Sequence, residues 1–331
     1  MPRKLIFIFP GQASQYVGMG RDLYDHSPAA RAVMDRIAAL DGLSHIPNLC
    51  FNGPEELLTR TDNVQPAITA VSLMALEALR VAALDKGIDL TPVACAGHSL
   101  GEYAAHCAAG NLTLEQTMTL VRWRGVWMNE TSQAPHPEGA MLAIMGLTLE
   151  QVEEVVVKAG SDRLAVANLN SPGQIIVSGE KSAIANAEKI APSMGAKRCV
   201  ILKVSGAWHS PLMRPAQAKM SELLTREITP DKVTFNPAIP VVANATANVV
   251  SSLDEMRNTL TRQITSLVRW EACISRLLQI AASEPPPLFV EIGPGKVLKG
   301  LLRNIDKSLD IANVEDFAGV TNIPPYAVGG D

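Results

Sequence analysis

Cysteines are few in this sequence, and no apolar run is long enough to cross a membrane without interruption. The five cysteines are scattered and include no C-x-x-C pair, which argues against a disulfide framework and against a structural zinc site. Charged or polar residues break every apolar stretch before the roughly eighteen residues that a membrane span needs, and the N-terminus leads into a strand pattern rather than a signal peptide. We therefore expect no membrane span and a reducing, cytoplasmic environment.

Signatures of nucleic-acid or cofactor binding are also missing. The net charge of −4 argues against a nucleic-acid-binding protein. The segment Gly293-Pro-Gly-Lys296 lacks the spacing and the trailing Ser or Thr of a phosphate-binding loop, and we find no metal or flavin motif. We therefore expect no metal and no cofactor. Hydrophobic residues at 47% and charged residues at 19% are typical of a globular protein with a sizeable core.

Four short apolar runs have the pattern of strands that are buried on both faces of a parallel sheet. Each ends in a polar or glycine-rich turn, and they cover residues 4–9, 93–96, 239–243 and 288–292. Helical patterns lie between them, the clearest beginning near Asp62 and Asn63 with Pro66 in its first turn. This alternation predicts an α/β fold, with a hydrolase-like parallel sheet covered by helices.

A change of composition at residues 132–139 marks the start of a second unit. The segments that follow run strand, helix, strand, strand, helix, strand, which is the order of a ferredoxin-like domain. We therefore predict an inserted ferredoxin-like (βαββαβ) small domain at 132–204, a discontinuous hydrolase-like large domain formed by 1–131 and 205–313, and a tail without chemistry at 314–331. Ligand sites favour such domain junctions.

The sequence Gly97-His-Ser-Leu-Gly101 has the G-x-S-x-G pattern of a nucleophile elbow. A predicted strand precedes it, and a helical segment at residues 100–109 follows it. In such an elbow the hydroxyl of Ser99 projects from a tight turn, and the free amides at the start of the helix favour a developing oxyanion. A chance match in a glycine-rich turn is the alternative, which the flanking strand and helix disfavour.

A serine nucleophile needs a base, and His209 is the best placed of the six histidines. It follows the last strand of the predicted insertion, where the chain returns to the domain junction. His98 adjoins Ser99 and should point away from it on a sharp turn, and His136 lies in the linker. A satisfied loop histidine is the alternative for His209. No acidic residue nearby is an evident orienting group, so a backbone carbonyl or an amide could orient the base.

Several blocks of the sequence are informative as a set: Phe9-Pro-Gly-Gln-Ala-Ser-Gln15, Gly97-His-Ser-Leu-Gly-Glu-Tyr103, Arg124-Gly, Asn170-Ser-Pro-Gly-Gln174, Ser205-Gly-Ala-Trp-His209 and Glu291-Ile-Gly-Pro-Gly-Lys296. In this order they resemble the malonyl-CoA:acyl carrier protein transacylases of fatty acid synthesis. The resemblance extends over nearly the whole chain, and the set is far more specific than any one motif.

The resemblance implies that a malonyl group moves from malonyl-CoA to the phosphopantetheine thiol of acyl carrier protein in two half-reactions. Ser99 would be the acylated nucleophile and His209 its general base. The backbone N–H groups of Gln12 and Leu100 would form the oxyanion hole. Gln263 would supply an acceptor that orients His209.

By the same resemblance Arg124 would hold the free carboxylate of the malonyl group, and its neighbours give an independent reason for that role. The side chains one helical turn away are all apolar: Leu120, Val121, Trp127 and Met128. A guanidinium on an apolar face is costly unless it is paired, and its fork matches a carboxylate. Arg122 has more mixed neighbours. A structural ion pair or a snorkelling side chain is the alternative for Arg124.

Other matching positions have structural explanations beside the functional ones. Gln65 corresponds to a residue at the wall of the family's cleft, but capping of the following helix explains it equally well. Asn168 and Asn170 could line the small-domain side of the cleft, although asparagines beside the Pro-Gly turn that ends at Gly173 are more often turn residues. Trp208 stands where the family often has another residue, and an indole there would disfavour branched extenders such as methylmalonyl.

The expected partners are malonyl-CoA and an acidic acyl carrier protein, and we expect a monomer. One candidate docking face is the cationic run of Lys296, Lys299, Arg303 and Lys307, which has a solvated surface as its alternative reading. Two other functions use the same Ser–His pair. A serine acyl-thioester hydrolase would have no need of Arg124, whereas an acyltransferase that loads a polyketide synthase would differ only in its partner.

Overall fold

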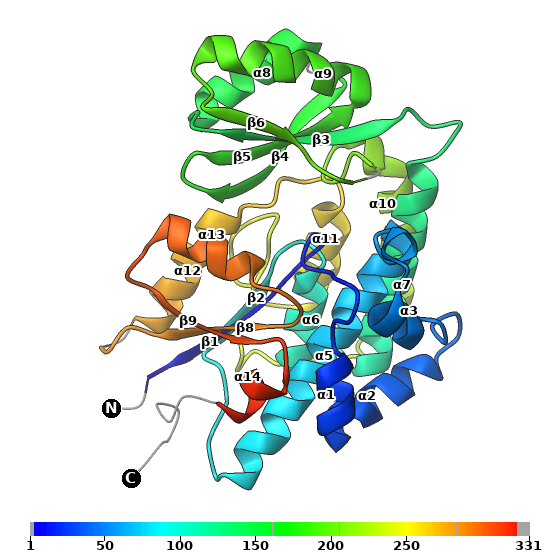
Figure 1. The fold of residues 1–331 in the computed structure, drawn as a ribbon, viewed down its shortest axis with the longest axis vertical. Helices are drawn as coiled ribbons and strands as arrows, with labels where there is room; N and C mark the ends of the chain where they lie inside the picture. Colours follow the sequence, from blue (N-terminus) through cyan, green and yellow to red (C-terminus); the bar gives the residue numbers. More distant parts are fainter. Residues whose placement is uncertain (1–2, 161, 205, 283, 323–331) are drawn as a thin grey trace.

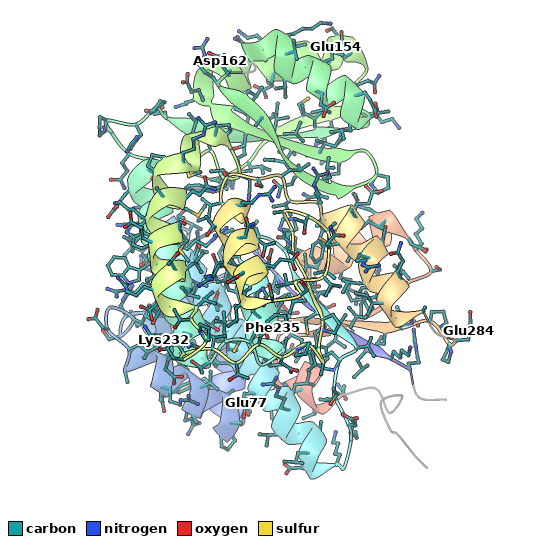
Figure 2. The ribbon with its side chains drawn as sticks, turned by 180° about the vertical axis from the view of Figure 1, so that it is seen from behind. Glu77, Glu154, Asp162, Lys232, Phe235 and Glu284 are labelled. Atoms are coloured by element: carbon teal, nitrogen blue, oxygen red, sulfur yellow. The ribbon has the colours of Figure 1, made fainter. Side chains whose placement is uncertain are left out.

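The computed structural model describes residues 3–160, 162–204, 206–282 and 284–322, which form a large and a small domain (Figure 1). The predicted α/β class, with a parallel sheet and a separate small antiparallel domain, is confirmed. In Figure 2, which views the molecule from behind, Glu154 and Asp162 lie at the outer end of the small domain. The opposite side of that domain faces the large one, and the candidate site lies near this junction.

The large domain is built on a five-stranded sheet in the order β7-β2-β1-β8-β9, in which all neighbours are parallel. The strands are β1 (Leu5–Phe9), β2 (Ala94–Gly97), β7 (Val241–Val242), β8 (Leu288–Ile292) and β9 (Asp310–Val314). Four of them lie in the predicted apolar runs. The edge strand β9 was not predicted, because it carries polar residues at Asp310 and Asn313 and is only partly buried.

Alternate residues of β1 point into two different cores, as a strand with two covered faces requires. Phe7 and Phe9 join a large cluster on one face of the sheet, together with side chains of α2 (Pro28–Ala38), α5 (Thr61–Asp85) and α7 (Leu114–Thr131). Ile6 and Ile8 join a second cluster on the other face, with side chains of α12 (Trp270–Ala281) and α13 (Val297–Ile305). The continuous apolar run of β1 thus follows from helices on both sides of the sheet.

The helices of the large domain are α1 (Arg21–His26), α2 (Pro28–Ala38), α3 (Ile46–Asn52), α4 (Glu55–Leu58), α5 (Thr61–Asp85), α6 (Gly101–Ala108), α7 (Leu114–Thr131), α10 (Arg214–Glu227), α11 (Leu253–Gln263), α12 (Trp270–Ala281), α13 (Val297–Ile305) and α14 (Phe317–Thr321). A 3-10 turn at Pro211–Met213 precedes α10. Helices α5 and α7 pack against each other, and they supply two of the polar side chains of the candidate site.

Helix α5 is longer than its sequence pattern indicates. It begins at Thr61, so Pro66 lies inside the helix, in its second turn rather than its first. By length and composition alone α5 could cross a membrane, but 72% of its most apolar window is buried inside the protein. That burial is typical of a central core helix.

The small domain is a four-stranded antiparallel sheet in the order β4-β5-β3-β6. Its elements follow the predicted βαββαβ order: β3 (Gly139–Met145), α8 (Leu149–Gly160), β4 (Leu164–Ser171), β5 (Gln174–Glu180), α9 (Lys181–Ile190) with a 3-10 turn at Ala191–Met194, and β6 (Arg198–Ile201). Placing the first strand between the third and the fourth is the ferredoxin-like arrangement. The helices cover one face around an apolar cluster of their own.

Backbone hydrogen bonds join the small domain to the large one. The N–H of Leu169 donates to the carbonyl of Val268 at 2.9 Å, and the N–H of Val268 donates to the carbonyl of Ala167 at 2.8 Å. Asn168, which is 5% exposed, lies between these two bonds and pairs with Val268 in a parallel bridge. One edge of the small sheet is therefore attached directly beside the candidate site.

The expectation of a separate tail from residue 314 is corrected in its described part. Val314 ends β9, and Phe317–Thr321 form α14, which packs against α5 and β9. The polar sequence conceals this because only Val314 and Val320 are buried there. The remainder of the expected tail, residues 323–331, lies outside the described residues.

We predict that Gly97→Ala destabilises the fold by about 3 kcal/mol, as overpacking of a tight contact does. A Cβ at Gly97 would lie 1.9 Å from the carbonyl carbon of Gly101. The matched control is Gly300→Ala on α13, where a Cβ meets no atom within 4 Å and the better helix propensity should add about 1 kcal/mol. Urea unfolding measures both, and equal midpoints for the two variants would contradict the packing argument.

Candidate active site

Ser99 lies on a tight turn between β2 and α6 with φ at 52°, a left-handed conformation that costs energy for a residue with a side chain. The turn is possible because Gly97 and Gly101 allow the helix start to touch the strand ends. A Cβ at Gly101 would lie 2.1 Å from the carbonyl oxygen of Phe9. Asn244, two residues after the end of β7, holds the turn by accepting from the N–H of Ser99 at 2.6 Å and donating to the carbonyl of Gly97 at 2.8 Å.

His209 contacts Ser99 directly, with 2.7 Å between its Nε2 and the Oγ of Ser99. Its other nitrogen, Nδ1, lies 2.8 Å from the backbone carbonyl of Gln263. A carbonyl only accepts, so Nδ1 carries the proton and Nε2 is left to accept from the serine hydroxyl. The sequence left open whether a carbonyl or an amide orients His209, and in the structure the carbonyl lies in that place.

The imidazole of His209 is 4% exposed. Burial, reinforced by the positive charge of Arg124, lowers the pKa of His209 from its ordinary value of 6.5 to about 3. The residue is therefore neutral near pH 7 in the free protein, which is the form that takes up a proton. An anion beside Arg124 would cancel part of that charge and raise the pKa of the base.

Arg124 of α7 is 1% exposed, and its guanidinium reaches the same serine. Its Nη1 donates to Oε1 of Gln65 at 2.7 Å, and its Nη2 donates at 3.2 Å both to Oγ of Ser99 and to Oε1 of Gln263. Its Nε has no partner in the described part of the chain. Arg122, two residues earlier, instead pairs with Asp41.

No carboxylate of the described residues lies within ion-pair distance of Arg124. All of its acceptors are neutral oxygens. Burial lowers the pKa of Arg124, but a guanidinium keeps its charge in proteins. A buried cation held by neutral groups is suited to bind an anion, because such a site has already lost most of its water.

Gln65 is fully buried and does not cap α5, whose N-cap position is Arg60. Its Oε1 accepts from Arg124, and its Nε2 lies 3.3 Å from Oε1 of Gln12 and 3.4 Å from Sδ of Met128. The amide of Gln65 thus connects Arg124 to the turn that follows β1. Of the two explanations for Gln65, the structure favours a place in the cleft wall.

The backbone amides of Gln12 and Leu100 both belong to turns at the carboxyl edge of the sheet. Neither N–H donates to an acceptor among the described residues. The turn that carries Gln12 lies against the nucleophile turn, since a Cβ at Gly11 would be 2.5 Å from the carbonyl oxygen of His98. Two free donors beside one serine hydroxyl fit an oxyanion site.

Two buried residues of this network were not assigned any role from the sequence. Glu102 lies one helical turn beyond Ser99, and its carboxylate accepts from the N–H of Asn244 at 3.0 Å and from Nε2 of Gln263 at 2.7 Å. A usable signal existed for Asn244, since it is a polar residue directly after a predicted parallel strand. For Glu102 the only signal was its place in the quoted Gly97–Tyr103 block.

Asn168 and Asn170 lie in β4 rather than in a turn. Asn170 reaches across the domain junction, where its Oδ1 lies 2.8 Å from Nε2 of His98. The ring of His98 also packs edge-on against Trp270. His98 therefore points away from Ser99, as predicted from its position on the turn.

Trp208 is 4% exposed and belongs to the large core cluster. The six-membered ring of its indole covers Gly206, where a Cβ would lie 2.3 Å from Cη2 of Trp208 and 2.4 Å from Oγ of Ser132. The effect of this indole on acyl-chain size stays a prediction.

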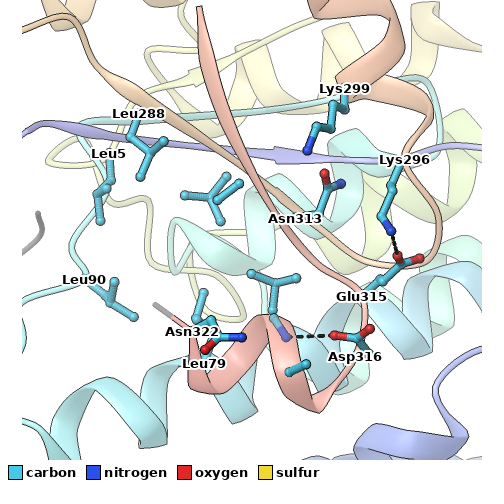
Figure 3. Close-up of a pocket in the computed structure, with 15 residues that line it drawn as sticks. Leu5, Leu79, Leu90, Leu288, Lys296, Lys299, Asn313, Glu315, Asp316 and Asn322 are labelled. Atoms are coloured by element: carbon cyan, nitrogen blue, oxygen red, sulfur yellow. Dashed lines mark hydrogen bonds and ion pairs between the residues drawn. The ribbon is translucent and has the colours of Figure 1, made fainter. Parts of the chain in front are cut away.

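The candidate docking face on α13 borders a separate cavity of about 360 Å³. Its apolar wall includes Leu79 and Leu288, and its rim carries Lys296 in an ion pair with Glu315 at 2.6 Å (Figure 3). No residue of the Ser99 network lines this cavity. In the same described region no ion pair involves Lys299, Arg303 or Lys307, so the face keeps three unpaired cations.

No group of three or more His, Cys, Asp or Glu side chains in the described ranges could hold a metal ion. The polar groups that converge on Ser99 are instead one imidazole, one guanidinium, amides and a carboxylate. These groups can move a proton, stabilise an oxyanion and bind a second anion, as covalent acyl transfer requires.

Comparisons with known proteins agree with a site for acyl transfer. A family model for an acyl transferase domain matches residues 6–326. The malonyl CoA-acyl carrier protein transacylase of Bacillus subtilis (strain 168) is 40% identical over 317 residues, which are 95% of this chain and 94% of that protein. The structure of acyl-carrier-protein-S-malonyltransferase from Bartonella henselae superposes with a TM-score of 0.85 at 35% identity and covers 96% of this chain and 97% of its own. A malonyl-transacylase solved in complex with its type II PKS acyl-carrier protein has a TM-score of 0.84 at 34% identity, with coverages of 96% and 97%.

We predict that His209 stays neutral from about pH 8 down to about pH 5, whereas an ordinary histidine titrates near 6.5. The measurement is the chemical shift of its ring protons against pH, assigned by their loss in His209→Asn. Folding lowers this pKa. As the pH falls through about 6.5, His209 therefore takes up a proton in the unfolded chain but not in the native state, so His209 lowers the stability of the fold in acid. A titration midpoint near 6.5 in the folded protein would contradict the burial argument.

Proposed function

The chain belongs to the acyl transferase family that includes the malonyl-CoA:acyl carrier protein transacylases, and we propose that it transfers a malonyl group through Ser99. The donor is malonyl-CoA, and the acceptor is the phosphopantetheine thiol of an acyl carrier protein. The observation that carries the proposal is the buried, carboxylate-free guanidinium of Arg124 at 3.2 Å from the nucleophile. A malonyl thioester has one free carboxylate close to its reactive carbonyl, and that pair of groups fits Arg124 and Ser99.

In the first half-reaction the carboxylate of malonyl-CoA binds Arg124 and replaces the 3.2 Å contact of its Nη2 with the Oγ of Ser99. The hydroxyl of Ser99 attacks the thioester carbonyl and gives its proton to Nε2 of His209. The negative charge on the carbonyl oxygen is stabilised by the N–H groups of Gln12 and Leu100. The C–S bond then breaks, and coenzyme A leaves with the proton from His209.

The second half-reaction reverses these steps with another thiol. His209 takes the proton of the phosphopantetheine thiol, whose sulfur attacks the ester carbonyl of malonyl-Ser99. The bond to the serine oxygen breaks, Ser99 regains its proton from His209, and malonyl-carrier protein is released. Both substrates use one site in turn, and the steps as written need no metal or cofactor beyond the coenzyme A thioester.

The two alternative functions differ from this one in identifiable ways. A hydrolase would pass the same acyl-serine to water, but clearing simple acyl groups gives no reason to bury Arg124. Loading a polyketide synthase would use the same residues and another carrier protein, as in the solved complex with a type II PKS carrier protein. The relatives named as malonyl CoA-acyl carrier protein transacylases favour fatty acid synthesis.

The setting that we propose is a monomer in the cytoplasm. The five cysteines are free in the structure, and Cys50, Cys95 and Cys273 are buried, which suits a reducing compartment. The unpaired cations on and just after α13, Lys299, Arg303 and Lys307, offer a docking face to an acidic carrier protein. The cytoplasmic setting rests on the free thiols, and the docking face rests on charge. Transfer of the malonyl group to a carrier protein tests the docking face.

We predict that malonyl-CoA adds one malonyl group to the wild-type chain, which intact-protein mass spectrometry detects, and that Ser99→Ala gains none. Arg124→Ala should lose about 100-fold in the acylation rate with malonyl-CoA, or about 2.7 kcal/mol for a charge-assisted contact. It should lose little with acetyl-CoA, which has no carboxylate to bind.

The matched control is Arg122→Ala, which removes an arginine of the same helix that pairs with Asp41 away from Ser99. It should acylate like wild type. Release of free coenzyme A without a lasting adduct, and without transfer when a carrier protein is added, would favour a hydrolase. Absence of any reaction with the wild-type chain would overturn the proposal.

A further inference from the structure

Glu102 is a fully buried carboxylate beneath the nucleophile turn. It is the second residue of α6, and its side chain turns inward below Ser99 instead of toward solvent. Fully buried glutamates are rare unless they are paired, and no described cation contacts this one directly. The reaction proposed above assigns no step to Glu102.

The contacts of Glu102 are asymmetric. Its Oε2 accepts two hydrogen bonds, from the backbone N–H of Asn244 and from Nε2 of Gln263. Its Oε1 is buried without a partner among the described residues. A buried carboxylate oxygen without a partner is costly. The site therefore satisfies Oε2 with two hydrogen bonds while Oε1 is left without one.

Two residues connect Glu102 to the reacting groups: Asn244, which holds the nucleophile turn, and Gln263, which contacts more of these groups. The Nε2 of Gln263 donates to Glu102 and, at 2.9 Å, to the backbone carbonyl of Ser99. Its Oε1 accepts from Arg124, and its backbone carbonyl accepts from Nδ1 of His209. One residue therefore contacts the base, the anion-binding cation and the nucleophile turn.

The orientation of the Gln263 amide decides whether these contacts are possible. If the amide were flipped, its oxygen would face the oxygens of Glu102 and Ser99, and its NH₂ would face the guanidinium of Arg124. All three contacts would then be repulsive. The acceptor on Glu102 supplies the shortest bond of the set, 2.7 Å, that holds the observed orientation.

We propose that Glu102 is a positioning residue for acyl transfer: as an acceptor it holds the Gln263 amide so that Oε1 faces Arg124 while the backbone carbonyl faces His209. The inference rests on the proposed function, because it concerns the same acylation of Ser99. Glu102 itself touches neither substrate nor reacting atoms. Its effect on malonyl binding passes through Arg124, and its effect on the base passes through the backbone of Gln263.

The electrostatic setting agrees with this geometry. Burial raises the pKa of Glu102 to about 7, and its hydrogen bonds and the charge of Arg124 oppose that rise. The titratable groups around it are Arg124 of α7, Tyr103 of its own helix and Cys273 of α12. What Gln263 needs from Glu102 is an acceptor at the position of Oε2, and a neutral amide oxygen there would serve as well.

The test compares two substitutions of nearly the same size. Glu102→Met fills the space without any acceptor, and Glu102→Gln keeps an acceptor at the position of Oε2 without the charge. Single-turnover acylation with malonyl-CoA and with acetyl-CoA is measured for both. Glu102→Met should lose at least tenfold with malonyl-CoA and lose part of the malonyl-over-acetyl preference, whereas Glu102→Gln should stay within about threefold of wild type.

The matched control is Glu291 on β8, another fully buried glutamate, which binds the N–H groups of Leu298 and Lys299 and lies outside the Ser99 network. Both Glu291→Met and Glu102→Met should lower the melting temperature, but Glu291→Met should leave acylation unchanged. This separates positioning from the general cost of losing a buried acceptor.

Equal acylation by wild type and folded Glu102→Met would overturn the inference, and so would equal losses in Glu102→Met and Glu102→Gln. If Glu102→Met does not fold, Glu102→Asp replaces it, because the shorter side chain withdraws the acceptor from Gln263; wild-type rates in that variant would overturn the inference in the same way. Failure of the wild-type chain to react with malonyl-CoA would refute the proposed function instead.

Discussion

The close approach of a helix start to the ends of two parallel strands is the constraint on which the site depends. Gly97 and Gly101 permit backbone contacts that any side chain would block. The turn between them holds Ser99 in a left-handed conformation, which Asn244 stabilises from the segment after β7 through two short hydrogen bonds. Because of this packing the turn after β1 lies beside the nucleophile, and the free amides of Gln12 and Leu100 belong to one small region.

The buried charges near Ser99 are arranged so that a bound anion would supply the partner that Arg124 lacks. Arg124 is buried among neutral acceptors, and the carboxylate of Glu102 lies one residue away from it behind Gln263. A direct Arg124–Glu102 ion pair would satisfy both groups and leave no cation for a substrate. Separating them by an amide keeps the guanidinium available, at the cost of a buried carboxylate oxygen without a partner. Burial and, after it, the charge of the same cation lower the pKa of His209, so binding of an anion and activation of the base are coupled.

Prediction from the sequence succeeded where the signal is local. Apolar runs identified four of the five parallel strands, and the alternation of patterns identified the ferredoxin-like insertion. It failed for β9 and α14, whose segments are polar and half exposed and are ordered by contacts with β8 and α5. It also placed Asn170 in a turn, because a Pro-Gly pair follows, whereas β4 continues through Asn170 to its contact with His98.

The sequence by itself determined the elbow at Ser99 and the apolar surroundings of Arg124, because both depend on residues within one helical turn. The resemblance to a known family added the two amides of the oxyanion site and supported His209, which its position along the chain had already singled out among the six histidines. Only the tertiary structure decided that Glu102 and Asn244 lie beneath the nucleophile and that the carbonyl of Gln263 orients His209. Those contacts join residues more than fifty positions apart, and their geometry is set by the packing of α6, α11 and the sheet, which no local pattern encodes.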